Sequence, residues 1–105
     1  MYQSYTGVFG KTVTLVVADT VQVLDEVLDF GDNPPIGILV SCEENAVRCA
    51  FRVDPTATFG HVLEKDLTAK FLSHPYAAKM RVINDTAQSA GVLMITPLYE
   101  AGKYS

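Results

Sequence analysis

The chain has 105 residues, a hydrophobic fraction of 49% and a formal net charge of −4, a composition typical of one globular domain and unlike that of a disordered chain. Its eight Lys and Arg residues are scattered, which argues against nucleic-acid binding. No signal-peptide pattern opens the sequence, and its longest uncharged run, residues 86–99, is too short and too polar for a membrane helix. We therefore expect a single soluble domain over residues 1–105, without membrane contact.

Most of the chain is expected to form short β-strands separated by turn residues. Apolar runs of strand type occupy residues 12–17, 36–42, 46–53, 66–72, 80–84 and 91–98. Residues 20–30 fit either a helical face or an alternating strand, and we favour a strand because the surroundings are β. One helical turn is expected over residues 73–78, with Ser73 as its cap and Pro75 near its first position. About seven or eight short strands predict an all-β protein, an antiparallel β-sandwich of jelly-roll type.

The two cysteines lie on either side of a short polar connection. If Asn45-Ala46 is the turn of a hairpin, Cys42 falls opposite Cys49 and both point to the face that carries Phe51. A cross-strand disulfide is conceivable in that geometry. Two buried free thiols are the favoured alternative, because the sequence shows no sign of secretion.

The residues that could carry catalysis are sparse. His61 and Glu64 could suggest a metal pair, but no second histidine lies close by, and His74 precedes Pro75 in what we interpret as a surface turn. The acidic residues around Gly31 lack the spacing of a calcium loop. We therefore expect no catalytic residue, no metal site, no cofactor and no enzymatic activity.

Aromatic residues gather near both ends of the chain. We interpret residues 1–10 and 100–105 as interaction arms, because tyrosine gives a large contact area at low entropic cost. The alternative is that these side chains lie back on their own sandwich. The candidate interface residues are Tyr2, Tyr5, Phe9, Tyr99 and Tyr104.

Residues 48–63, R-C-A-F-R-V-D-P-T-A-T-F-G-H-V-L, resemble a pattern in small virion proteins of tailed bacteriophages. In those proteins an I-R-x-R-x-D-G strand leads into D-P-T-A-T-x-G-H-x-L, and a weaker similarity extends over residues 36–99. This chain has Val53 where those relatives tend to carry a glycine. The resemblance implies a capsid cement or decoration protein, often a trimer, with a jelly-roll-like sandwich. It implies the major capsid protein as partner and a location on the phage head surface, after synthesis in the bacterial cytoplasm.

Residues 54–61 of that pattern, D-P-T-A-T-F-G-H, also have a simple physical interpretation as a structural loop. A residue before proline leaves the helical region, Asp and Thr side chains bond to nearby backbone, and glycine permits a positive φ. We prefer this structural role to ligand binding for Asp54, Pro55, Thr56, Thr58, Gly60 and His61.

Two other functions remain as alternatives to a head protein. One is a tail-associated or receptor-binding module that binds glycans, for which Tyr76 and Asn84-Asp85 are the best candidates. The other is a cupin-like metalloenzyme, which metal analysis of the purified protein would test.

Overall fold

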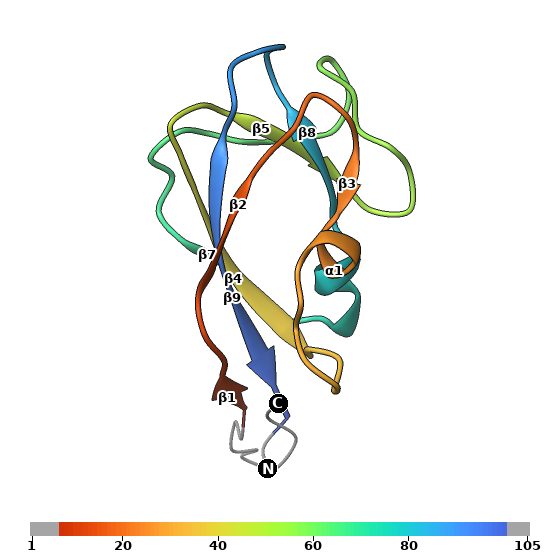
Figure 1. Cartoon of the computed structure of the whole chain (residues 1–105), viewed down its shortest axis with the longest axis vertical. Helices are drawn as coiled ribbons and strands as arrows, with labels where there is room; N and C mark the ends of the chain where they lie inside the picture. Colours follow the sequence, from red (N-terminus) through yellow and green to blue (C-terminus); the bar gives the residue numbers. More distant parts are fainter. Residues whose placement is uncertain (1–6, 101–105) are drawn as a thin grey trace, which may run out of the picture.

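The computed structural model describes residues 7–100, which form two antiparallel β-sheets that face each other (Figure 1). Sheet A has the order β1-β9-β4-β7, and β2 pairs with β9 beside β1. Its strands are β1 (Val8–Phe9), β2 (Val13–Val16), β4 (Gly37–Glu43), β7 (Lys70–Leu72) and β9 (Val92–Tyr99). Sheet B has the order β3-β8-β5-β6. Its strands are β3 (Gln22–Val23), β5 (Val47–Ala50), β6 (His61–Leu63) and β8 (Arg81–Asn84).

The strand order is that of a jelly roll. The order β2-β9-β4-β7 faces β3-β8-β5-β6, which is how two interleaved Greek keys arrange eight strands in two sheets. The short β1 extends the edge of sheet A beside β2. The expectation of an all-β antiparallel sandwich is therefore confirmed.

The core is built from the inward side of each strand. β9 alternates along its length, and its inward residues Leu93 and Ile95 lie opposite Cys42 and Val40 of β4. Sheet B contributes buried residues such as Val82. Because side chains on a strand alternate between its faces, each of these strands leaves its other face outside the core.

The expected hairpin between residues 36–42 and 46–53 is wrong. β4 pairs with β7 and β9, whereas β5 pairs with β6 and β8, so the short connection crosses between the sheets. Its first residue, Glu44, has a φ of 70°. Cys42 and Cys49 are consequently not cross-strand neighbours; both are buried free thiols, as the favoured alternative predicted.

Other boundaries also differ from the sequence-based expectations. In residues 20–30 the strand β3 is followed by one helical turn, α1 (Leu24–Val27), whose Leu24 is buried. The strand expected over residues 66–72 is limited to β7, and His61, the last residue of the expected structural loop, is the first residue of β6. The turn after β7 is a 3-10 helix, η1 (Pro75–Lys79), capped by His74 and not by Ser73.

None of the helices in the described part of the chain has the length and apolar character needed to cross a membrane.

Candidate functional site

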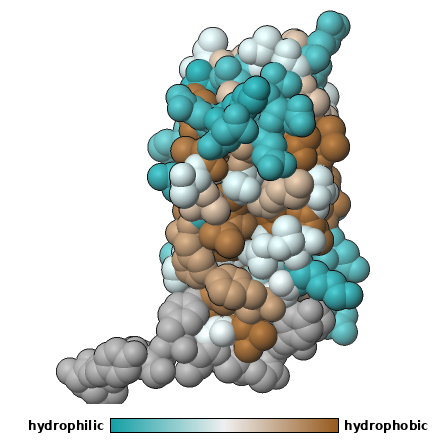
Figure 2. All heavy atoms as spheres, turned by 90° about the vertical axis from the view of Figure 1, so that its left-hand side faces the viewer, coloured by the Kyte–Doolittle hydropathy of each residue, from teal (hydrophilic) through white to brown (hydrophobic). Residues whose placement is uncertain are grey.

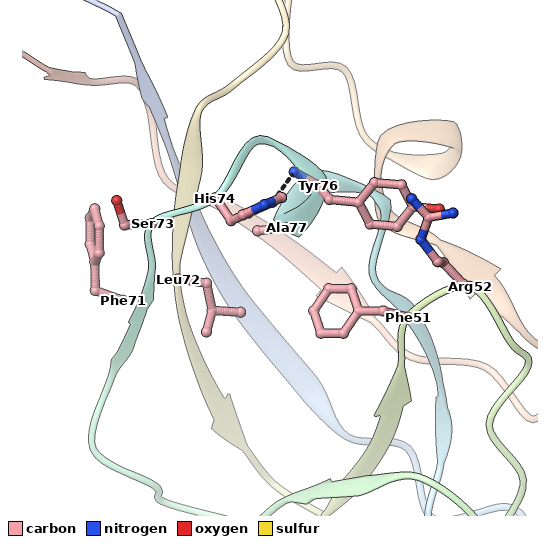
Figure 3. A pocket seen from close by; sticks show the side chains of 8 residues that line it. All are labelled: Phe51, Arg52, Phe71, Leu72, Ser73, His74, Tyr76 and Ala77. Carbon is pink, nitrogen blue, oxygen red and sulfur yellow. Dashed lines mark hydrogen bonds between the residues drawn. The ribbon is translucent and has the colours of Figure 1, made fainter.

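The sandwich is open along the side where β6 and β7 form the edges of their sheets. Three cavities of about 490, 340 and 230 Å³ lie there, and the side chain of Phe51 lines all three. We call this region the edge groove. Its largest part is lined by Phe51, Arg52, Phe71, Leu72, Ser73, His74, Tyr76 and Ala77 (Figure 3).

Phe51 and Arg52 reach the groove because β5 stops at Ala50. The strand expected to continue to Val53 breaks at Arg52, whose φ is 66°. Phe51 and Val53 are exposed, although Phe51 also shares a cavity with the buried Val40 and Cys49. The break turns the Arg52 side chain over Tyr76, with its guanidinium carbon 4.7 Å from the ring centroid. This is the distance of a cation–π contact, which holds the charge at the rim of the groove.

η1 supplies the opposite wall of the groove. Its cap, His74, accepts a hydrogen bond at Nδ1 from the backbone N–H of Tyr76, at 3.0 Å (Figure 3). In the neutral imidazole the hydrogen then sits on Nε2, which is a donor. The Tyr76 ring lies 6.4 Å from that of Phe51, so an aromatic pair closes this end of the groove.

The charge of the edge groove is opposite to that of the whole chain. Among the described residues that line the three cavities there are two cations, Arg52 and Lys70, and two histidines, His61 and His74, but no Asp or Glu. Within residues 7–100, no ion pair joins Arg52 or Lys70 to a carboxylate. By contrast, three other basic residues are neutralised, in the pairs Arg48–Asp85, Lys79–Asp25 and Arg81–Asp54.

A second surface is the outer face of sheet A, the face turned away from sheet B (Figure 2). Figure 2 shows apolar residues across the middle of this side, with hydrophilic residues gathered toward its upper end. Among the described residues that point outward on β2, β4, β7 and β9, Glu43 at the end of β4 is the charged one. The uncharged ones include Thr14, Val16, Leu39, Ser41, Phe71, Met94 and Thr96.

Of the candidate interface residues, Phe9 is at the surface and three others lie outside the described residues. Phe9 is 55% exposed on β1, and its ring meets that of Phe71 edge to face at 6.2 Å. Tyr2, Tyr5 and Tyr104 lie outside the described residues.

Tyr99 is not a surface residue, contrary to the expectation from its place near the end of the chain. Its side chain is 2% exposed in the core, and its hydroxyl donates a hydrogen bond to the backbone carbonyl of Phe30. The inward alternation of β9 continues through this position, which explains its burial.

The segment from Asp54 to His61 connects β5 to β6. Asp54 accepts a hydrogen bond from Arg81 at 2.6 Å, and Thr56 and Phe59 exchange two backbone hydrogen bonds. The Thr58 backbone N–H donates to Thr56 Oγ1, and Pro55 is buried. Gly60 has a φ of 119°, and His61 follows it as the first residue of β6, opposite Cys49.

The remaining glycan candidates are engaged within the protein. Asn84 is buried; its amide donates to Asp19 and its oxygen accepts from the Gly91 N–H. Asp85 accepts from Arg48 at 2.7 Å. Of the residues proposed for a glycan site, Tyr76 alone lines a cavity described above.

No group of three or more His, Cys, Asp and Glu side chains is arranged to hold a metal ion within residues 7–100. Burial raises the pKa of the Cys49 thiol to about 11, and burial together with Asp66 and Glu43 raises the pKa of Cys42. Both thiols are therefore protonated near neutral pH, which disfavours their action as nucleophiles.

The fold places the chain in the class of jelly-roll β-sandwiches. Comparison with known families, with curated proteins and with solved structures found no match to this chain.

Proposed function

We propose that this chain is a non-enzymatic structural protein of a tailed-phage particle, a cement or decoration protein that binds the major capsid protein and stabilises the head. The largely uncharged outer face of sheet A is the observation that carries the proposal. Phe71 and Val16 are 41% and 61% exposed on it, and large exposed apolar patches mark interaction surfaces. A sandwich of this size can contribute a face of this kind to a particle without any chemistry of its own.

The resemblance of residues 48–63 to phage virion proteins supports the same proposal. In the fold these residues form one continuous unit, from β5 through the Pro55 loop to β6. The positive φ of Gly60 and the buried Pro55 give this unit a defined shape, so the motif maintains the fold.

Binding to capsids tests the proposal directly. Val16→Asp adds a charge to the outer face at the edge strand β2, where Val16 pairs with Val92, and we expect it to abolish co-sedimentation with capsids assembled from the phage's own major capsid protein. Val62→Asp is the matched control, because Val62 is 40% exposed on β6 of the other sheet, and it should bind as the unmodified chain does. Failure of the unmodified chain to bind, or equal loss in both variants, would contradict the proposal.

The solution mass of the purified protein tests the oligomeric part. A stable trimer of the 11.4 kDa chain supports a cement protein that stands at a symmetry axis of the head. A monomer contradicts a preformed trimer and favours a subunit that assembles on the particle or belongs to the tail.

A tail-associated glycan-binding module is the second candidate function. It is favoured by Tyr76, which lies in the edge groove beneath the Arg52 guanidinium, since aromatic faces beside polar groups suit sugar rings. A glycan array probed with the unmodified chain and with Tyr76→Ala tests it. Binding that disappears in the variant supports this candidate, and an array without signal rules it out.

A further inference from the structure

We propose that the edge groove binds an extended segment of a partner protein in which apolar side chains alternate with carboxylates. The proposal deepens the proposed function, on which it rests only for the identity of the partner as a protein of the same particle. It is carried by three features of the groove: its apolar walls, the sign of the charge at its rim, and its position between two sheet edges.

The walls can bury apolar side chains of the partner. The largest cavity, about 490 Å³, is within the size range of ligand pockets. Phe51 is 39% exposed and lines all three cavities. Figure 3 shows Phe51 and Leu72 directed into the space between β7 and η1. Covering these two side chains gives the association a hydrophobic contribution.

The rim selects the charge of the partner. Arg52 and Lys70 supply positive charge to the three cavities, His61 and His74 also line them, and no acidic side chain lines them among the described residues. In a chain with a net charge of −4, this is a local region that attracts anions. A basic segment would be repelled at the rim, whereas a purely acidic one would leave the apolar walls uncovered.

The position of the groove favours an extended conformation of the partner. The smallest cavity is lined from one sheet by Lys70 and Leu72 of β7, and from the other by His61 and Leu63 of β6. The opening therefore follows two strand edges. In an extended chain, successive side chains point to opposite sides, so apolar residues can enter the opening while the carboxylates between them meet the cations at its rim.

Three peptides tested against the full chain by fluorescence anisotropy examine the chemistry. The probe is fluorescein-labelled Glu-Phe-Glu-Leu-Glu, and the controls are Lys-Phe-Lys-Leu-Lys and Glu-Ser-Glu-Ser-Glu. We expect binding of the first alone, weakened about five-fold or more when the salt is raised to about 0.5 M. Equal binding of either control, or no binding of the first peptide at about 1 mM, would overturn the proposal.

A pair of double variants locates the binding. Arg52→Glu with Lys70→Glu reverses the rim, and Lys11→Glu with Lys65→Glu makes the same change in net charge at exposed positions outside the edge groove. We expect the first pair to weaken the probe about ten-fold or more and the second less than about two-fold. Equal weakening of probe binding in both double variants would show that binding depends on net charge alone, which would refute the assignment of the binding site to the edge groove. If the first pair unfolds, Arg52→Gln and Lys70→Gln singly should each weaken the probe more than Lys65→Gln does.

Capsid binding and peptide binding, both measured on the unmodified chain, separate this proposal from the proposed function. If the peptide binds but the unmodified chain does not bind capsids, the proposed function fails and the groove assignment stands. If capsids bind and the peptide does not, the reverse holds.

Discussion

Replacing Tyr99 with phenylalanine tests whether this residue belongs to the core or to an interface. The change removes only the hydroxyl, which donates a hydrogen bond to the Phe30 carbonyl in the interior of the sandwich. Tyr99 and Phe30 are 2% and 7% exposed, so water does not readily replace the lost donor. Leaving a buried acceptor without this partner costs about 1–3 kcal/mol of the free energy of unfolding.

The assay is thermal and urea unfolding of the unmodified chain and of Tyr99→Phe. A domain of this length has an unfolding entropy that converts about 1–3 kcal/mol into a decrease of about 5–14 °C in Tm. The slope of the urea transition should be unchanged, because the variant exposes the same surface when it unfolds.

Tyr76→Phe is the control, since the ring of Tyr76 lines the edge groove and is not part of the buried core cluster. We expect its free energy of unfolding to stay within about 0.5 kcal/mol of that of the unmodified chain. If Tyr99→Phe unfolds like the unmodified chain but no longer binds capsids, the hydroxyl acts at an interface. That result would refute the burial argument.

Three further predictions concern stability. Gly60→Ala should lower the free energy of unfolding by about 1–3 kcal/mol, because the φ of Gly60 is 119° and a Cβ there would lie 2.8 Å from the Cys49 carbonyl oxygen. Urea unfolding measures this change, and an unchanged midpoint of the transition would contradict it. Burial raises the pKa of Cys49 to about 11, so the unfolded state loses the thiol proton at a lower pH than the folded state does. The free energy of unfolding should therefore fall between about pH 9 and pH 11. In Cys49→Ala its decrease over this range should be less steep. Hydrogen bonds from the Asn84 side chain and the Gln88 backbone lower the pKa of Asp19 below 3.8, so its contribution is present above its unfolded pKa and is lost as the pH falls through the lower folded value. Asp19→Asn should be less stable at pH 7 and less sensitive to acid; the same acid dependence in both proteins would count against this.

The jelly roll was predictable in its elements but not in its connections. The apolar runs at residues 36–42 and 91–98 are bounded by turn residues and predict two strands of sheet A, β4 and β9. The connection at Asn45 is short enough for a hairpin and also suits a crossing between sheets, and local sequence cannot distinguish them. Which of the two connections forms is determined by strand pairing between residues far apart in the sequence, such as that of Val16 with Val92.

The edge groove was harder to predict, because its residues come from separate segments. Phe51 and Arg52 follow β5, whereas His74 and Tyr76 belong to η1 and its cap, and only the folded sandwich brings them together. The turn at Arg52 has a positive φ that arginine seldom adopts, so the sequence gives no sign of it. Tyr99 was also not predictable from the sequence, because nearly all residues of β9 are apolar and only the strand register shows which of them point inward.

The two candidate surfaces share the strand β7. The Phe71 ring lies on the outer face of sheet A and contacts Phe9 edge to face, whereas Lys70 and Leu72 line the edge groove. A partner segment in the groove therefore lies beside the surface that the outer face presents to a capsid. β6 and β7 have only three residues each, and short edge strands limit pairing through the backbone. Recognition at this edge then depends on side chains, so the rim-reversed variant should affect both peptide and capsid binding when the two surfaces act together.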